Sequence, residues 1–196
     1  MTTVGLIRHG STEWNRLGKL QGQIDTDLTD EGRNQAQLLG LRLRNEEWTH
    51  MISSDLSRAK ETAQIISEFS GIPLTGLDMR LRERSFGLAE GLTLPERLER
   101  WGEDWRNLDL GGESNEDVWA RWLDFATELS QTYTNDEKIL LISHGGTIHQ
   151  ILRGLQLERE EFLQNTSISV IQRVDSSWNL LLYNCLSHLE VTKDSH

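Results

Sequence analysis

Length, composition and charge narrow the class of protein. The chain has 196 residues, which suits one ordinary domain, so we expect a single domain over residues 1–196. Acidic residues outnumber basic ones 31 to 20, which gives a formal net charge of −11. Because such a chain neutralises nucleic-acid phosphates and anionic lipids poorly, we expect no nucleic-acid partner and no membrane partner.

The number of cysteines and the length of the apolar runs indicate where in the cell the protein is located. The single cysteine, Cys185, excludes an intrachain disulfide and a zinc site built from several cysteines. No apolar run approaches the roughly 18 residues of a membrane span, and residues 1–11 carry no secretory signal pattern. A cytoplasmic location is therefore expected.

The first part of the chain alternates short apolar runs with amphipathic segments. Thr29 is a good helix N-cap, Ser54 or Asp55 is expected to cap a second helix, and Gly71 should end that helix. In chain order the pattern predicts a strand over residues 3–7, a helical turn and loop over 11–22, a helix over 29–47, a strand over 49–53, a helix up to residue 71 and a weak strand over 73–77.

The rest of the chain continues this alternation after a polar interruption. Ser114 and Asp117 form a capping-box pattern, and residues 138–143 are the clearest buried strand. In chain order we expect irregular structure over residues 78–91, a segment of mixed character over 93–112, a helix from 114 to about 129, a strand over 138–143, a helix up to 152, a β-hairpin of 167–174 with 178–183, and a frayed tail after 188. Strands that alternate with helices predict an α/β fold, a three-layer α/β/α sandwich with a mainly parallel central sheet.

Similar polar residues follow three of the predicted strands. The strand over 3–7 runs into Arg8-His9-Gly10, Arg58 lies in the first turn after the second strand, and residues 138–143 run into His144-Gly145. Each of these residues alone also fits a structural role. Because ligands bind beyond the carboxyl ends of parallel strands, the joint placement of two imidazoles and two guanidinium groups predicts an anion site, and a phosphate site above all.

The segments around these residues resemble the histidine phosphatase superfamily, which has the phosphoglycerate mutase-like fold. The resemblance covers residues 4 to about 153, and its motifs occur in the family's order. They are residues 6–15 (LIRHGSTEWN), 21–22 (QG), 27–32 (DLTDEG), 35–36 (QA), 53–59 (SSDLSRA) with Thr62-Ala63, 81–83 (LRE) with Gly87 and Glu90-Gly91, 111–114 (GGES) and 143–146 (SHGG).

The resemblance implies a role for each matching residue. His9 would be the nucleophile that becomes a phosphohistidine, and Glu83 would protonate the leaving oxygen and then activate water. The implied phosphate-binding set is Arg8, Asn15, Gln21, Gly22, Arg58, His144 and Gly145. Independently of the resemblance, Arg8 and Arg58 should disfavour a proton on His9, which predicts a neutral, nucleophilic imidazole.

The surroundings of Glu83 leave a second interpretation open. Arg80, Arg82 and Arg84 flank it, so a surface ion-pair cluster is an alternative to a catalytic acid. If close, these arginines would lower its pKa, whereas a general acid needs a raised one.

No metal or other cofactor is expected. His144 and His149 are five residues apart and do not share one helix face, and the sequence has neither an H-E-x-x-H motif nor a phosphate-binding P-loop motif.

Residues 78–113 are expected to form an insertion that acts as a lid or pocket wall. Trp101, Trp105 and Leu98 could line a pocket or fill the core. Residues 93–113 carry three arginines against six acids, a poor match for the second anionic group that a mutase must hold. We therefore favour a metal-independent phosphatase acting on a small phosphorylated metabolite. The alternatives are a cofactor-dependent phosphoglycerate mutase and an inactive module that binds a phosphorylated ligand or partner; a homodimer is left open.

Overall fold

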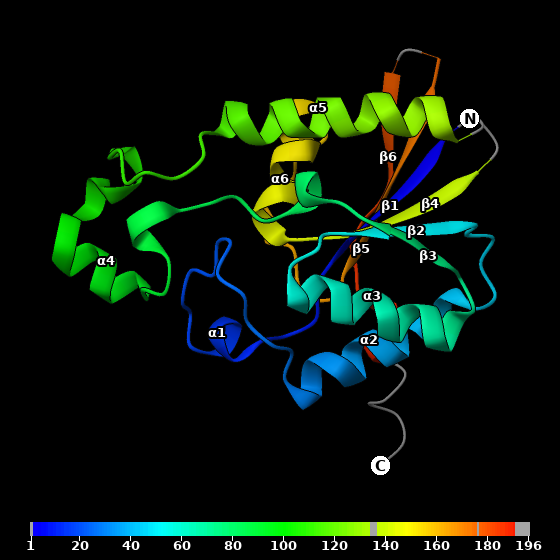
Figure 1. Ribbon diagram of the computed structural model, residues 1–196, viewed down its shortest axis with the longest axis horizontal. Helices are drawn as coiled ribbons and strands as arrows, with labels where there is room; N and C mark the ends of the chain where they lie inside the picture. The colour runs from blue at the N-terminus through cyan, green and yellow to red at the C-terminus, as the bar shows by residue number, and fades with distance from the viewer. Residues whose placement is uncertain (1, 134–136, 176, 191–196) are drawn as a thin grey trace.

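The computed structural model of the chain describes residues 2–133, 137–175 and 177–190. In this part of the chain one six-stranded sheet forms, with the strand order β3-β2-β4-β1-β5-β6 (Figure 1). The strands are β1 (Thr3–Arg8), β2 (His50–Ser53), β3 (Leu74–Leu77), β4 (Lys138–Ser143), β5 (Ile168–Val174) and β6 (Ser177–Cys185). β3, β2, β4 and β1 are parallel to one another, whereas β5 is antiparallel to both β1 and β6, so the sheet is mainly parallel as predicted.

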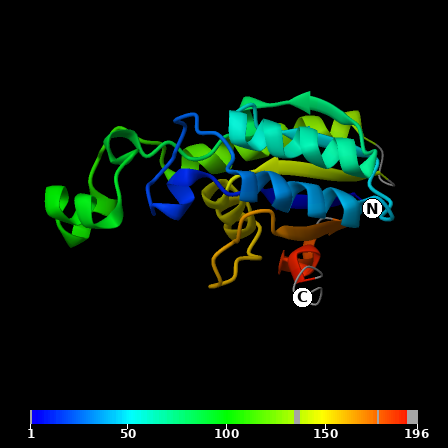
Figure 2. The same ribbon diagram turned by 90° about the horizontal axis from the view of Figure 1, so that it is seen from below.

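Helices cover both faces of the sheet, which confirms the three-layer α/β/α prediction (Figures 1 and 2). The α-helices are α1 (Glu13–Arg16), α2 (Asp30–Leu43), α3 (Ser57–Ser70), α4 (Leu94–Trp101), α5 (Asn115–Thr132), α6 (Gly145–Gly154) and α7 (Ser187–Glu190), and short 3-10 turns lie at η1 (Met79–Leu81), η2 (Gly87–Ala89) and η3 (Glu103–Asn107). None of the helices in the described ranges is long and apolar enough to cross a membrane.

Alternation along β4 divides the core into two clusters. Leu140 and Ile142 pack with α2 and α3, whereas Ile139 and Leu141 pack with α5 and α6. Successive side chains of a strand point to opposite faces, so an apolar strand of this kind is buried on both sides. Burial on both faces fixes the register of β4, because a shift by one residue would exchange the two clusters.

The register brings the ends of three strands to one edge of the sheet. Arg8 at the end of β1 is paired with Ser143 at the end of β4, and Ser53 at the end of β2 is paired with Ile142. The residues that follow β1, β4 and β2 therefore leave the sheet side by side, although they are far apart in the sequence.

Two predicted helix boundaries are wrong. The helix expected over 29–47 ends at Leu43, because the polar residues that follow offer no apolar side chain to bury. The predicted cap at Ser54 or Asp55 is also wrong, since Leu56 occupies the N-cap of α3 and no side chain caps it. The Ser54 hydroxyl accepts from the backbone N–H of Leu56 and also contacts His144.

Other predicted boundaries are confirmed. Thr29 caps α2, Ser114 and Asp117 form a capping box at α5, and Gly71 ends α3 in a left-handed conformation. The predicted hairpin forms from β5 and β6, with residue 176 of its turn outside the described residues. α7 continues to Glu190, and the part of the predicted frayed tail over 191–196 also lies outside them.

Residues 78–113 leave the sandwich and return to it. The part around α4 and η3 projects from one end of the molecule, on the side where α1 lies (Figures 1 and 2). α4 begins with a capping box between Thr93 and Glu96, yet Leu94 and Leu98 on this helix are 42% and 39% exposed. The segment is thus locally ordered, but α4 leaves part of its apolar surface exposed.

Candidate active site

His9 and His144 meet at the edge of the sheet that the strand register creates. His9 follows β1 and His144 follows β4, and the His9 backbone N–H donates to the Ser143 carbonyl at 3.0 Å. The centroids of the two imidazole rings lie 5.2 Å apart, and both residues are buried. Parallel neighbouring strands thus bring together two histidines that lie at opposite ends of the sequence.

The hydrogen bonding of His9 determines which ring nitrogen is available. Its Nδ1 lies 2.7 Å from the Gly10 carbonyl oxygen, which can only accept, so Nδ1 carries the hydrogen and Nε2 keeps its lone pair. Burial, then Arg58 and then Arg8, lowers the pKa of His9 well below its usual value. The ring is therefore neutral at neutral pH, as the sequence predicted.

Arg8 and Arg58 lie beside this ring and bond to backbone carbonyls. Arg8 donates to the Leu163 carbonyl at 2.6 Å, and Arg58 donates to those of Gly22 at 2.7 Å and Ile24 at 2.8 Å. The Nε atoms of both arginines are buried and have no hydrogen-bond partner in the part of the chain that the structure describes. Burial lowers the pKa of Arg8 to about 10 and also lowers that of Arg58, which leaves Arg8 protonated at neutral pH. The pair offers positive charge and unused donors to an anion.

His144 is fully buried beside the same cations. Burial first, and the charge of Arg58 second, lowers the pKa of His144 well below its usual value, so this ring is neutral too. Its Nε2 lies 2.9 Å from Ser54 Oγ, and its Nδ1 has no hydrogen-bond partner among residues 2–133, 137–175 and 177–190.

Glu83 reaches the site from the segment after β3. One carboxylate oxygen accepts from the backbone N–H of Arg84 at 2.8 Å and of Thr147 at 2.9 Å, and the other accepts from the N–H of Gly146 at 3.0 Å. Because Gly146 and Thr147 lie in the first turn of α6, the carboxylate binds to free N–H groups at a helix N-terminus.

The ion-pair interpretation of Glu83 is wrong, because the flanking arginines bind elsewhere. Arg82 forms a bidentate pair with Asp55, and the side chain of Arg84 donates to the Glu113 carbonyl and to Asn115. Arg80 pairs with Asp78, Asp124 and Glu128. The three guanidinium groups therefore bind partners other than the Glu83 carboxylate, which accepts hydrogen bonds from backbone N–H groups instead.

A cavity of about 490 Å³ opens at these residues. Eight of the residues singled out from the sequence line it: Arg8, His9, Asn15, Gln21, Gly22, Arg58, Glu83 and Gly145. His144 lies behind this wall and contacts the site through its ring. The structure thus places these eight residues around one cavity and His144 beside His9.

The amides of Asn15 and Gln21 are held in one orientation by accepted hydrogen bonds. Asn15 Oδ1 accepts from the Thr12 backbone N–H at 3.1 Å and from Asn165 at 3.2 Å. Gln21 Oε1 accepts from Thr12 at 3.0 Å and from Thr26 at 2.6 Å. With both oxygens engaged, the amide nitrogens remain available as donors at the cavity.

Several lining residues were missed by the sequence analysis. Phe162, Gln164 and Asn165 come from the loop before β5, and Asn165 Nδ2 donates to the His9 carbonyl at 2.9 Å. No local pattern marks this loop, because its contact with His9 spans 156 residues. The remaining members are Trp14, Gly18, Lys19, Leu20, Phe86 and Gly146.

The tryptophans of the insertion stay outside the cavity. Trp105 is buried between the guanidinium groups of Arg97 and Arg106, at 4.5 and 4.7 Å from its ring centroid. Neither Trp101 nor Leu98 lines the cavity around His9. Of the segment 78–113, only Glu83 and Phe86 reach its wall.

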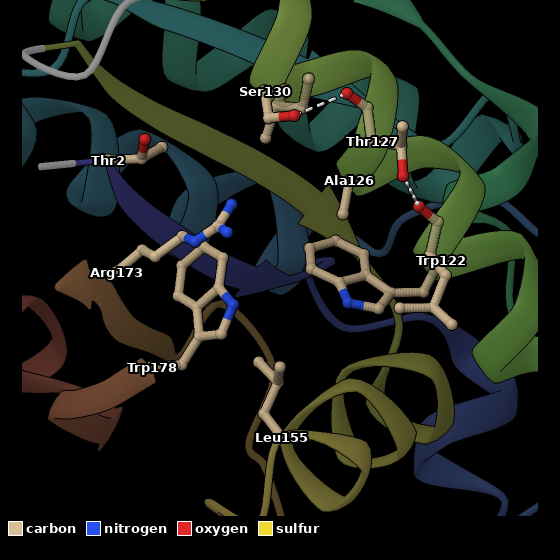
Figure 3. Close-up of a pocket in the computed structure, with 10 residues that line it drawn as sticks. Thr2, Trp122, Ala126, Thr127, Ser130, Leu155, Arg173 and Trp178 are labelled. Atoms are coloured by element: carbon tan, nitrogen blue, oxygen red, sulfur yellow. Dashed lines mark hydrogen bonds between the residues drawn. The ribbon is translucent and has the colours of Figure 1, made fainter. Parts of the chain in front are cut away.

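A second cavity of about 370 Å³ lies away from the histidines, between α5 and the β5–β6 hairpin (Figure 3). Trp122 and Trp178 form much of its wall, and Arg173 is the one charged side chain among its described lining residues. It contains none of the nine residues predicted from the sequence. Within residues 2–133, 137–175 and 177–190, no group of three or more His, Cys, Asp or Glu side chains is arranged to hold a metal ion.

Comparison with known proteins places the chain in a family. The histidine phosphatase superfamily (branch 1) matches residues 4–186. A Bacillus subtilis (strain 168) relative, "Uncharacterized phosphatase PhoE", is 35% identical, and the alignment covers 96% of this chain and 97% of the relative. Two Arabidopsis thaliana relatives are also similar: "Phosphoglycerate mutase-like protein 4" is 34% identical, with 95% and 86% covered, and "Metal-independent phosphoserine phosphatase" is 33% identical, with 96% and 84% covered.

Solved structures agree with these sequence relatives. The mycobacterial glucosyl-3-phosphoglycerate phosphatase complexed with VO3 superposes with a TM-score of 0.84 at 29% identity, and the match covers 93% of this chain and 99% of that one. The family model, the relatives and the solved structure therefore point to the same family as the paired histidines and the buried arginines. The chain belongs to the histidine phosphatase superfamily and is a phosphatase.

Proposed function

We propose that this chain is a metal-independent phosphomonoesterase that hydrolyses small phosphorylated metabolites through a phosphohistidine on His9. The observation that carries the proposal is the neutral His9 ring, which donates through Nδ1 to Gly10 and keeps the Nε2 lone pair at a cavity lined by two buried arginines. Hydrolysis in two steps needs a nucleophile that is unprotonated at working pH, and this ring meets that requirement.

In the first step the Nε2 lone pair of His9 attacks phosphorus and the bond from phosphorus to the ester oxygen breaks. Arg8 and Arg58 balance the charge on the phosphoryl oxygens, with Asn15, Gln21 and the backbone around Gly22 and Gly145 completing the phosphate pocket. Phosphoryl transfer proceeds through a loose transition state whose charge is spread over these oxygens, so positioned cations and N–H donors supply most of the catalysis.

Glu83 is the proposed proton donor to the leaving oxygen. In the second step its carboxylate takes a proton from water, the water oxygen attacks phosphorus and the N–P bond breaks, which restores His9 and releases phosphate. Its hydrogen bonds from Gly146 and Thr147 hold the carboxylate in place at the cavity.

Residues 78–113 are proposed as the wall and partial lid of the pocket. Glu83 and Phe86 from this segment line the cavity, and the part around α4 projects at the same end of the molecule (Figure 2). Substrate size and shape would then depend on this segment, whereas the chemistry depends on the strand ends.

The test is turnover of a panel of phosphorylated metabolites with EDTA present, together with acid quenching. Free phosphate should appear, and quenching should trap an acid-labile, alkali-stable phosphoryl adduct that His9→Ala lacks. Undiminished adduct on His9→Ala would reject His9 as the nucleophile. Incubation with 3-phosphoglycerate and a bisphosphate primer separates the alternatives, since an isomer without free phosphate identifies a mutase. The absence of turnover at any pH would favour a binding module.

A further inference from the structure

Three buried nitrogen atoms beside the site have no hydrogen-bond partner among the described residues. They are Arg8 Nε, Arg58 Nε and His144 Nδ1. The two guanidinium nitrogens can only donate, whereas a neutral imidazole nitrogen either donates or accepts, according to the tautomer. The tautomer of His144 therefore decides whether the third group presents a hydrogen or a lone pair.

Ser54 contacts the other nitrogen of this ring. Its hydroxyl lies 2.9 Å from His144 Nε2 and also accepts from the backbone N–H of Leu56 at 3.3 Å. Ser54 is fully buried, so its hydroxyl hydrogen must be donated within the protein. Among the described residues, the acceptor within reach of that hydrogen is His144 Nε2.

We propose that Ser54 is a positioning residue for the phosphatase reaction: it donates its hydroxyl hydrogen to Nε2 of His144 and thereby places the imidazole hydrogen on Nδ1. The inference rests on the proposed function for its catalytic consequence. With this tautomer Arg8, Arg58 and His144 present three N–H donors to one phosphoryl group.

The opposite tautomer would present a lone pair to the phosphoryl oxygens. Protonation cannot correct this at neutral pH, because burial and the neighbouring arginines keep the pKa of His144 low. A neutral histidine can serve as a donor here only if its hydrogen is on the correct nitrogen. Control of a catalytic tautomer by a neighbouring acceptor or donor is a general device in histidine-dependent enzymes.

The chain offers a matched pair of variants. Ser54→Ala removes the hydroxyl that contacts the ring. Ser53→Ala removes a neighbouring hydroxyl that is equally buried but donates to the Ser54 carbonyl at 2.8 Å and does not contact His144. A purely structural role predicts similar effects of both substitutions.

The first measurement is the ¹⁵N NMR spectrum of the histidine rings at neutral pH, with the His144 signals assigned by their loss in His144→Gln. In the unsubstituted protein and in Ser53→Ala, Nε2 should give the signal of an unprotonated nitrogen and Nδ1 that of a protonated one. In Ser54→Ala the signals should move toward the opposite tautomer. A protonated Nε2 in the unsubstituted protein, or unchanged signals in Ser54→Ala, would overturn the inference.

The second measurement is steady-state kinetics. Ser54→Ala should lower kcat by about tenfold to a hundredfold with a smaller change in KM, because a donor to the transition state is weakened. Ser53→Ala should stay within about twofold. Equal losses in both variants contradict a specific role of Ser54. If the unsubstituted protein lacks turnover, the proposed function fails while the NMR result still decides the tautomer.

Discussion

The strand-end site and the projecting segment 78–113 are built in different ways. Arg8, His9, Arg58 and His144 are at most 8% exposed, and backbone carbonyls or buried hydroxyls hold each of them. In the projecting segment, Leu88 is 71% exposed, and Leu94 and Leu98 on α4 lie largely at the surface. The strand-end site is therefore held by close packing, whereas α4 begins with a local capping box and leaves apolar side chains at the surface.

This difference assigns separate tasks to the two regions. Side chains that must stay within hydrogen-bond distance of a reacting group need rigid elements beneath them, and the sheet edge supplies these. The segment around α4 has few buried contacts, which is typical of parts that open locally at low cost. Changes at the sheet edge should alter chemistry, and changes in the segment should alter access.

Glu83 provides the sharpest test, because it lies in the segment but its carboxylate is anchored on α6. Glu83→Gln should lower kcat/KM, which reports the step in which the leaving group departs, by about 10²- to 10⁴-fold for an alkyl phosphate, since the proton donor is lost. The loss should be smaller for p-nitrophenyl phosphate, whose leaving group needs no proton. Glu116→Gln, an exposed carboxylate on α5, serves as the control. An equal loss for both esters would contradict the role of a proton donor.

Stability should separate the sandwich from the segment in the same way. Phe125 on α5 is 3% exposed in the core, so Phe125→Ala should lower the free energy of unfolding by about 3–5 kcal/mol. Leu98→Ala on the partly exposed face of α4 should change it by less than about 0.5 kcal/mol. Denaturant unfolding of both variants measures this contrast. A large loss in Leu98→Ala would mean that α4 packs as tightly as the core.

A substitution at Gly146 tests the contact between the Glu83 carboxylate and the first turn of α6. A Cβ added there would lie 2.7 Å from Glu83 Oε1, so Gly146→Ala should displace the carboxylate and lower kcat by about tenfold to a hundredfold. Gly76→Ala is the control, because its Cβ meets nothing closer than 4.0 Å. The free energy of unfolding of both variants should be measured alongside. Unchanged kcat in Gly146→Ala would show that the position of Glu83 is not critical.

The pH dependence of kcat/KM tests the burial of the histidines and should show the smallest effect. The pKa of His9 is lowered, so His9 remains an active nucleophile as the pH falls through 6.5 and is protonated only well below that value. An acid limb at about 6.5 that is independent of the substrate would contradict this expectation. The limb caused by the second ionisation of the substrate, near pH 6, should move with the ester used.

The free energy of unfolding should also depend on pH, because the same histidines are buried. Burial lowers the pKa of His188 to about 4, and His9 and His144 shift in the same direction. Below pH 6.5 the unfolded chain binds more protons than the folded one, so the free energy of unfolding should decrease from pH 6.5 toward pH 4. The kcat/KM values at low pH should therefore be interpreted only at pH values where the protein remains folded.

The elements of the sandwich could be predicted because their signals are local. The apolar run of β4, the capping box of Ser114 and Asp117, and the left-handed Gly71 each depend on a few neighbouring residues. The cap at Ser54 was predicted wrongly because α3 begins later, with Leu56 as its N-cap; the Ser54 hydroxyl accepts from the Leu56 N–H and also meets a long-range partner, His144.

The sequence by itself determined the fold class, the two histidines and two arginines at the strand ends, and the resemblance that named Glu83. Only the tertiary structure decided that the arginines beside Glu83 turn away from it, that Ser54 meets His144, and that the loop of Phe162 and Asn165 closes the cavity. Secondary structure follows from periodicity and caps over a few residues. These partners lie 27 to 156 residues apart, and they are selected by strand register and by the need of each buried polar group for a hydrogen-bond partner.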